Sequence, residues 1–208
     1  PVRMADLLGE ALRLLADRAA DLGVAVRLDV PPDTPLLVAP PVELRQVFVH
    51  VAENALDAVE YAQPPVAQRE LAVTVRVEFP SSASSAPPES ATPVSPPSGS
   101  SPSASASPLS SSPPASSAFG TSGGEMCIAF HDTGHGIASE VLPHVFEPFF
   151  STRPVGRGMG LGLSVAVGVI TALGGFIDID SQPGDTTVTL RLPLPETPAE
   201  AAPPTCQG

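Results

Sequence analysis

The chain has 208 residues, of which 42% are apolar, and its 22 acidic and 10 basic side chains give a formal net charge of −12. This charge argues against nucleic acid or an anionic membrane surface as the main partner, because both attract basic patches. The two cysteines, Cys127 and Cys206, form neither a disulfide framework nor a metal-ligand pattern, which fits a cytoplasmic location. The longest apolar stretch is too short and too rich in glycine to span a bilayer.

Two helices and one strand are predicted in the first third of the chain. Apolar residues recur at helical spacing over residues 3–22, which predicts one amphipathic helix ending near Gly23. Alternating apolar residues over 24–30 predict a strand, which the following prolines end. After Pro41 the helical period returns and continues to about Tyr61.

The middle of the chain differs in composition from the rest. Residues 80–124 contain eighteen serines and ten prolines among forty-five positions, with Phe119 as the single aromatic residue. Such a segment cannot bury enough apolar surface to offset the entropy of ordering it, so we predict a disordered insert. The insert separates two alternating apolar runs, at 71–77 and 126–130, which we interpret as strands.

Beyond the insert the pattern predicts one more helix and two more strands. The helix runs from about residue 161 to residue 173, and the strands lie around 176–180 and 186–192. Helices segregated from a mixed sheet predict the α+β class, with a two-layer sandwich as the architecture. The chain therefore divides into an N-terminal part of one domain, the insert, a C-terminal part and a flexible tail, at residues 1–79, 80–124, 125–194 and 195–208.

A polar stripe crosses the second predicted helix. His50, Asn54 and Asp57 are spaced so that they share one face of that helix. Taken alone, the stripe is most simply a surface that faces solvent. An asparagine amide oxygen is nevertheless a suitable neutral ligand for Mg²⁺, which takes few protein ligands besides phosphate oxygens and waters.

Two segments rich in glycine are each ambiguous alone. Residues 132–136, Asp-Thr-Gly-His-Gly, follow a strand and suit a plain turn. Their glycines would also let a flat base approach the backbone, while the carboxylate could accept a hydrogen bond from an exocyclic amine. Residues 156–162 lead into a helix and could present N–H groups to phosphate. That signal is weak, because neither the dinucleotide-binding fingerprint nor the Walker pattern is present.

In combination and in this order, the segments resemble the motifs of the ATP-binding catalytic domain of sensor histidine kinases. The N box, first glycine box, F box and second glycine box resemble residues 50–58, 132–136, 146–150 and 158–164. The resemblance covers nearly the whole chain apart from the insert and the last fifteen residues. It implies the Bergerat ATP-binding fold, with nucleotide between the helices and a mobile lid.

The resemblance also implies roles for single residues. Asn54 would bind Mg²⁺, Asp132 would bind the adenine amino group, and Thr186 would help to hold adenine. Arg153 and Arg157 on the lid would join Asn54 in catalysis by neutralising the polyphosphate, unless they are solvated loop arginines. The residues that the resemblance places around ATP are His50, Asn54, Asp57, Asp132, Gly134, Gly136, Ile137, Phe149, Gly158, Gly160, Leu161, Gly162 and Thr186.

Several positions depart from the family pattern. His50 stands where these kinases usually have asparagine, and Asp57 stands where some have a basic residue. Arg153 replaces a common lysine, which keeps the charge but changes the hydrogen-bond geometry. The third glycine box, residues 184–187, is one residue short, with Val188 where phenylalanine is frequent. These departures concern the phosphate contacts and the rate more than nucleotide binding.

The function that the resemblance implies is transfer of the ATP γ-phosphoryl group to a histidine. The acceptor would lie on a helical dimerisation module outside this chain, in a homodimeric parent, and a response-regulator receiver domain would take the group next. Two alternatives stay open. A gyrase-type or chaperone-type ATPase has a glutamate where His50 stands, and a histidine could act as that base. The chain could also bind nucleotide without turning it over.

Overall fold

The computed structural model describes residues 1–65, 68–79, 124–152 and 159–195. Within these ranges it contains five strands, four α-helices and one short 3₁₀ helix. In chain order the elements are α1 (Met4–Leu14), α2 (Ala16–Asp21), β1 (Ala25–Asp29), α3 (Pro41–Ala62), β2 (Glu70–Glu78), β3 (Glu125–Asp132), η2 (Leu142–His144), α4 (Gly162–Ala172), β4 (Phe176–Gln182) and β5 (Asp185–Pro193).

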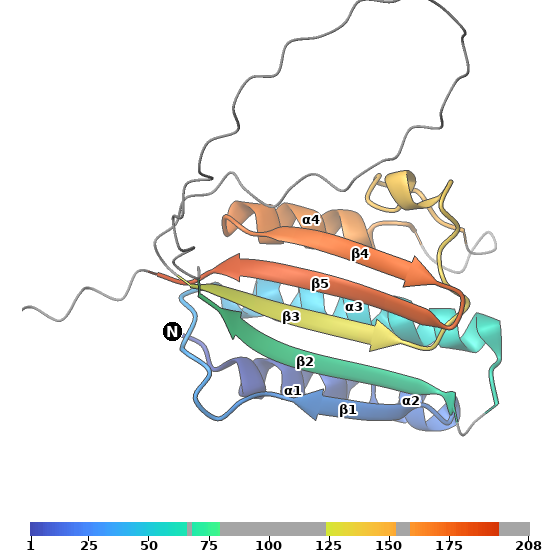
Figure 1. Ribbon diagram of the computed structural model, residues 1–208, viewed down its shortest axis with the longest axis horizontal. Helices are drawn as coiled ribbons and strands as arrows, with labels where there is room; N and C mark the ends of the chain where they lie inside the picture. Colours follow the sequence, from blue (N-terminus) through green and yellow to red (C-terminus); the bar gives the residue numbers. More distant parts are fainter. Residues whose placement is uncertain (66–67, 80–123, 153–158, 196–208) are drawn as a thin grey trace, which may run out of the picture. The chain divides into compact units, whose positions relative to one another are not determined.

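The five strands form one mixed sheet in the order β1-β2-β3-β5-β4. Strand β1 runs parallel to β2, and the other neighbouring pairs are antiparallel. The four α-helices lie on one face of this sheet (Figure 1). The predicted α+β class, with helices layered on a mixed sheet, is therefore confirmed.

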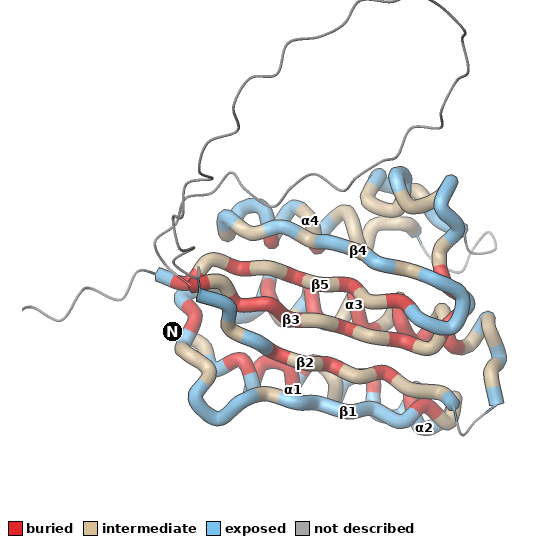
Figure 2. Tube along the Cα trace, viewed as in Figure 1, coloured by how far each residue is buried: buried red, intermediate tan, exposed pale blue. Residues whose placement is uncertain are grey.

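The core lies between the helices and the facing side of the sheet (Figure 2). Helix α3 is the central helix, and it contacts α1, α4, β2 and β3. The rings of Phe48 on α3 and Phe130 on β3 meet at a centroid distance of 6.0 Å. The buried side chains of α3 recur at helical spacing, as the sequence pattern predicted; they are Leu44, Val47, Phe48, Val51, Ala52, Ala55, Leu56 and Val59.

The single helix predicted over residues 3–22 is wrong, because the chain turns at Leu15 and forms α1 and α2 instead. Helix α1 packs on α3, whereas α2 contacts β1. Buried residues continue at helical spacing across the turn, since both Leu15 and Ala19 are buried. Neither glycine nor proline marks the break, so apolar spacing alone could not reveal it.

Strands β2 and β3 are antiparallel neighbours whose far ends pair Glu78 with Glu125. The predicted insert therefore joins two adjacent strands at one end of the sheet. Arg191 of β5 bridges these ends, with its Nη1 atom 3.2 Å from a Glu78 oxygen and 3.3 Å from a Glu125 oxygen. The predicted disordered insert, residues 80–124, lies outside the described residues apart from Gly124, which is buried, and the predicted tail, residues 195–208, lies outside them apart from its first residue. The predicted division of the chain stays a prediction.

Within the described ranges, no helix combines the length and the apolar character that crossing a membrane requires.

Candidate nucleotide site

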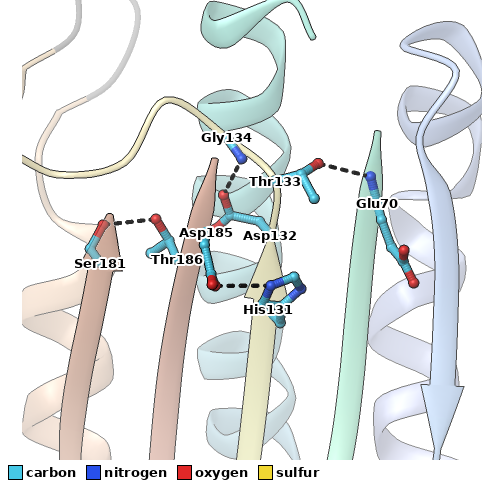
Figure 3. Close-up of polar contacts among 8 residues, drawn as sticks. All are labelled: Glu70, His131, Asp132, Thr133, Gly134, Ser181, Asp185 and Thr186. Carbon is cyan, nitrogen blue, oxygen red and sulfur yellow. Dashed lines mark hydrogen bonds and ion pairs between the residues drawn. The ribbon is translucent and has the colours of Figure 1, made fainter. Parts of the chain in front are cut away.

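One group of predicted site residues meets where β3 ends and β5 begins. Asp132 is the last residue of β3, and its partner across the sheet is Thr186 of β5 (Figure 3). Both residues are buried, with exposed fractions of 3% and 4%. The structure thus brings together the two side chains that the sequence assigned to adenine.

The Asp132 carboxylate is held by the loop that follows it. The Gly134 backbone N–H donates to its Oδ1 atom at 2.8 Å. Burial raises the pKa of Asp132 from 3.8 to about 6, although the Gly134 hydrogen bond and the nearby His131 and His135 act in the opposite direction. A buried carboxylate beside a backbone segment without bulky side chains can accept a hydrogen bond from an amine of a ligand.

Gly134 and Gly136 lie where side chains would collide with the atoms around them. A Cβ on Gly134 would lie 2.5 Å from the Ala58 Cβ, and a Cβ on Gly136 would lie 2.7 Å from the Gln182 carbonyl oxygen. Gly136 also has a φ of +78°, which favours glycine. Two backbone hydrogen bonds fix the loop: His135 N–H donates to the Ala58 carbonyl at 3.2 Å, and Gly184 N–H to the Gly134 carbonyl at 2.9 Å.

We expect Gly134→Ala to lower the free energy of unfolding by about 1–3 kcal/mol, because its Cβ would overlap Ala58 and push the loop away from Asp132. ATP binding should weaken with it. Gly168→Ala is the matched control, since this glycine lies in α4 and an added Cβ would meet nothing within 4 Å, and it should stabilise the chain by about 0.5–1 kcal/mol. Urea unfolding of both variants measures the difference, and equal effects of the two would contradict the predicted overlap.

A second group of predicted residues surrounds the start of α4. Phe149 has a φ of +67°, and its N–H donates to the Gly160 carbonyl at 3.0 Å. Gly160 itself has a φ of +65°, and a Cβ there would lie 2.5 Å from the Phe150 carbonyl oxygen. Leu161 precedes α4 and accepts a hydrogen bond from the Ser164 hydroxyl at 3.0 Å. The F box and the second glycine box are therefore in direct contact, as far as they are described.

Helix α3 connects the two groups. His50, Asn54 and Ala58 follow one another at four-residue spacing and so share one face of α3. His50 approaches Gly162, where a Cβ would lie 3.5 Å from the His50 Cβ, while Ala58 contacts Gly134. Asn54 therefore lies on the face of α3 between the loop after β3 and the start of α4.

Three of the predicted residues lie outside the described ranges, and a fourth, Asp57 of α3, forms an ion pair with a residue of another helix. The Asp57 carboxylate forms an ion pair with Arg18 of α2, whose Nη2 also lies 2.9 Å from Glu60. The structure thus ties Asp57 to α2. The predicted residues Arg153, Arg157 and Gly158 fall outside the described residues.

Ser181 of β4 is a site residue that the sequence reasoning missed. Its Oγ accepts the backbone N–H of Ile137 at 2.8 Å and lies 2.8 Å from the Thr186 Oγ1. One signal was present in the sequence. Ile177 and Ile179 point toward the helices along β4, and Ser181 takes the next such position with a hydroxyl.

The described histidine, cysteine and acidic residues contain one cluster with metal-ligand spacing, made by Glu78, Glu125 and Cys127. It lies at the opposite ends of β2 and β3 from Asp132, and the Arg191 guanidinium contacts all three side chains. Burial raises the pKa of the Cys127 thiol to about 11. A cation already among the carboxylates and a neutral thiol both disfavour a metal there.

Some known proteins resemble one part of this chain, and others resemble most of its length. Residues 111–196 match the model of the histidine kinase-, DNA gyrase B- and HSP90-like ATPase family. Over 75 residues the chain is 51% identical to the sensor kinase CckA of Brucella abortus, covering 35% of this chain and 8% of that protein. Over 192 residues it is 27% identical to the C4-dicarboxylate transport sensor protein DctB of Rhizobium meliloti, covering 92% of this chain and 23% of that protein. The chain thus spans less than a quarter of either relative.

Solved structures share the fold. The mycobacterial sensor histidine kinase MprB matches 92% of this chain and 95% of its own, with a TM-score of 0.58 and 20% identity. Full-length ShkA, crystallised in complex with AMPPNP, matches 92% of this chain and 30% of its own, with a TM-score of 0.60 and 21% identity. At these identities the likeness is one of fold alone.

Proposed function

We propose that this chain binds ATP with Mg²⁺ and delivers its γ-phosphoryl group to a histidine outside the chain. It belongs to the histidine kinase-, DNA gyrase B- and HSP90-like ATPase family, as the catalytic ATP-binding domain of a sensor histidine kinase. The observation that carries the proposal is the buried Asp132 carboxylate, held by the Gly134 N–H and placed opposite Thr186. The complex of ShkA with AMPPNP, an ATP analogue, supports the choice of nucleotide.

The two loops suit the two ends of a nucleotide. Adenine carries an exocyclic amine, which can donate to the Asp132 carboxylate, and the missing side chains at Gly134 and Gly136 leave the backbone open to a flat ring. The start of α4 offers backbone N–H groups at the positive end of a helix, which favours phosphate. Asn54, on α3 between the loops, would then lie beside the phosphates.

The donor set around Asn54 fits Mg²⁺ better than a transition metal. One amide oxygen is a hard, neutral ligand, and phosphate oxygens and waters would complete an octahedral shell. Bound Mg²⁺ would neutralise charge on the phosphates during transfer. The chain's own contribution would be to orient the nucleotide through Asp132 and Asn54. The same proposal has Arg153 and Arg157 neutralise part of the negative charge on the phosphates.

The reaction also requires partners. A histidine nitrogen on a helical dimerisation module would attack the γ-phosphorus, forming a P–N bond as the bond to the ADP oxygen breaks. A response-regulator receiver domain would then accept the phosphoryl group from that histidine. We propose a homodimeric parent whose catalytic part works in the cytoplasm, with no nucleic acid and no direct membrane contact by this domain.

One observation favours ATP hydrolysis as a second candidate function. The His50 Nδ1 atom lies 3.5 Å from a Glu53 oxygen, and a Cβ added to Gly162 at the start of α4 would lie 3.7 Å from the same Nδ1 atom. An imidazole oriented by a carboxylate can act as a general base toward water. Release of inorganic phosphate by the chain alone would support this candidate.

We expect the chain alone to bind ATP with Mg²⁺ and to remain unphosphorylated. Of its four histidines, His131 pairs with Asp185 at 3.0 Å, and His50 and His135 belong to the nucleotide-binding motifs. A side chain beside the phosphates of its own domain lacks the in-line geometry for attack. The measurement is incubation with radiolabelled ATP and Mg²⁺, with and without the helical module added in trans, followed by an assay for acid-labile phosphohistidine.

Label on the added module alone would support the proposal. Label on the isolated chain would contradict it. His144 is then the residue to test first, because it is half-exposed and its Nδ1 lies 2.8 Å from Glu147. Loss of that label in His144→Ala would identify the acceptor and overturn the assignment of the acceptor to another module.

A further inference from the structure

Three side chains form a row across the ends of β4, β5 and β3. Ser181 pairs with Thr186 in the register of β4 and β5, and Thr186 pairs with Asp132 in the register of β5 and β3. Figure 3 shows the Ser181 and Thr186 hydroxyls directed toward each other, at an oxygen–oxygen distance of 2.8 Å. Thr186 is buried and Ser181 half-buried. The row thus links the sheet edge at β4 to the carboxylate that we assign to adenine.

Ser181 also holds the loop that carries the two glycines. The Ile137 backbone N–H, directly after Gly136, donates to the Ser181 Oγ at 2.8 Å. A hydroxyl both accepts and donates, so the Ser181 oxygen can accept from Ile137 while its own proton is donated to Thr186 Oγ1, and this is the arrangement on which the proposal below depends. The Thr186 proton is then directed away from Ser181 and can be donated to a ligand beside Asp132.

We propose that Ser181 is a positioning residue that sets adenine specificity by fixing Thr186 as a hydrogen-bond donor and by anchoring the loop at Ile137. The inference rests on the proposed function. Adenine presents an amine donor and ring-nitrogen acceptors, which suit a carboxylate acceptor beside a hydroxyl donor. Guanine presents a carbonyl oxygen in place of the amine, which would face the Asp132 carboxylate unfavourably. A site whose polar groups are fixed in advance rejects the mismatched base most strongly.

The first test compares ATP and GTP binding to the whole chain in Mg²⁺ by calorimetry. Ser181→Ala removes one contact to Ile137 and one to Thr186, so we expect ATP binding to weaken about tenfold. GTP binding should change less than about twofold, so the preference for ATP falls. Thr189→Val is the matched control, because Thr189 lies on β5 outside the third glycine box and on the face of the sheet opposite Thr186. It should alter neither affinity by more than about twofold.

The second test asks whether the two hydroxyls act together. Thr186→Val removes the partner hydroxyl with little change of shape, and it should weaken ATP about as much as Ser181→Ala does. The double variant should lose less ATP affinity than the sum of the two single losses, because either change alone already breaks the contact between Ser181 and Thr186. Ser181→Thr keeps the hydroxyl and should restore ATP binding to within about threefold of the unaltered chain.

The third test uses no ligand, so it separates this inference from the proposed function. Amide hydrogen exchange at Ile137 should be about tenfold faster in Ser181→Ala than in the unaltered chain, because the N–H loses its acceptor. Should Ser181→Ala fail to fold, Thr186→Val still tests the hydroxyl pair. An unaltered chain that binds no ATP would overturn the proposed function. Normal ATP binding with an unchanged ATP-to-GTP ratio in Ser181→Ala, or additive effects in the double variant, would overturn the role of Ser181.

Discussion

We expect Asp132→Asn to stabilise the nucleotide-free chain at pH 8 by about 1–2 kcal/mol while weakening ATP binding about tenfold to a hundredfold. The stabilisation follows from burial. Burial raises the pKa of Asp132 from 3.8 to about 6, so keeping the carboxylate ionised in the folded chain costs about 3 kcal/mol. Asparagine retains an oxygen for the Gly134 N–H and carries no charge, although its buried NH₂ group cancels part of the gain.

The gain should depend on pH in a defined window. Because the folded-state pKa is the higher one, the folded chain binds more protons than the unfolded chain between about pH 4 and pH 6. The contribution of Asp132 to stability therefore falls as the pH rises through this range and is constant above it. The difference in unfolding free energy between Asp132→Asn and the unaltered chain should be about 2–3 kcal/mol less favourable to the variant at pH 4 than at the plateau, which it should reach by about pH 7.

The loss of ATP affinity follows from the same substitution. A hydrogen bond to a charged group contributes about 1.5–3 kcal/mol, which corresponds to the expected change in binding constant. Urea unfolding at several pH values measures the stability, and calorimetry with ATP and GTP measures the binding. Asp180→Asn, an exposed carboxylate on β4, is the control and should change neither quantity appreciably. Unchanged preference for ATP over GTP in Asp132→Asn would refute the adenine assignment.

Periodicity predicted most of the fold because most of its elements bury one face. The alternation after residue 70 and the helical spacing after Pro41 correspond to β2 and α3, both of which face the core. The turn at Leu15 was missed because the buried positions keep their spacing on both sides of it. Strand β1 was predicted correctly although all its residues are exposed at the edge of the sheet.

The candidate site was predictable where a motif carries its own geometry. Asp132 and Gly134 are two residues apart and meet through the backbone, so the segment itself determined that contact. Ser181 and Asp57 depend on partners from distant elements, Ile137 and Arg18, which no local pattern identifies. Local motifs therefore indicate contacts within a loop, whereas the side chains that hold a loop in place come from elements distant in the sequence.

We expect Asn54→Ala to reduce phosphoryl transfer at least about a hundredfold in the parent protein that carries the acceptor module, while the fold is retained. Asn54 is half-buried on α3, outside the buried residues of the core, so losing its amide should change the stability by less than about 1 kcal/mol. The loss of rate follows if Asn54 supplies the protein oxygen that holds Mg²⁺ against the phosphates, because a positioned ion contributes several kcal/mol to the transition state.

Binding measurements separate a metal ligand from a simple contact to the nucleotide. In the unaltered chain Mg²⁺ should strengthen ATP binding, whereas in Asn54→Ala the affinity should be the same with and without Mg²⁺. Asn54→Asp keeps an oxygen at the same place, so part of the Mg²⁺ dependence should return. Glu43→Ala, an exposed position in the first turn of α3, controls for the helix itself and should leave transfer and binding unchanged. If Asn54→Ala kept both its Mg²⁺ dependence and its rate of transfer, the ion would have to be held by other residues.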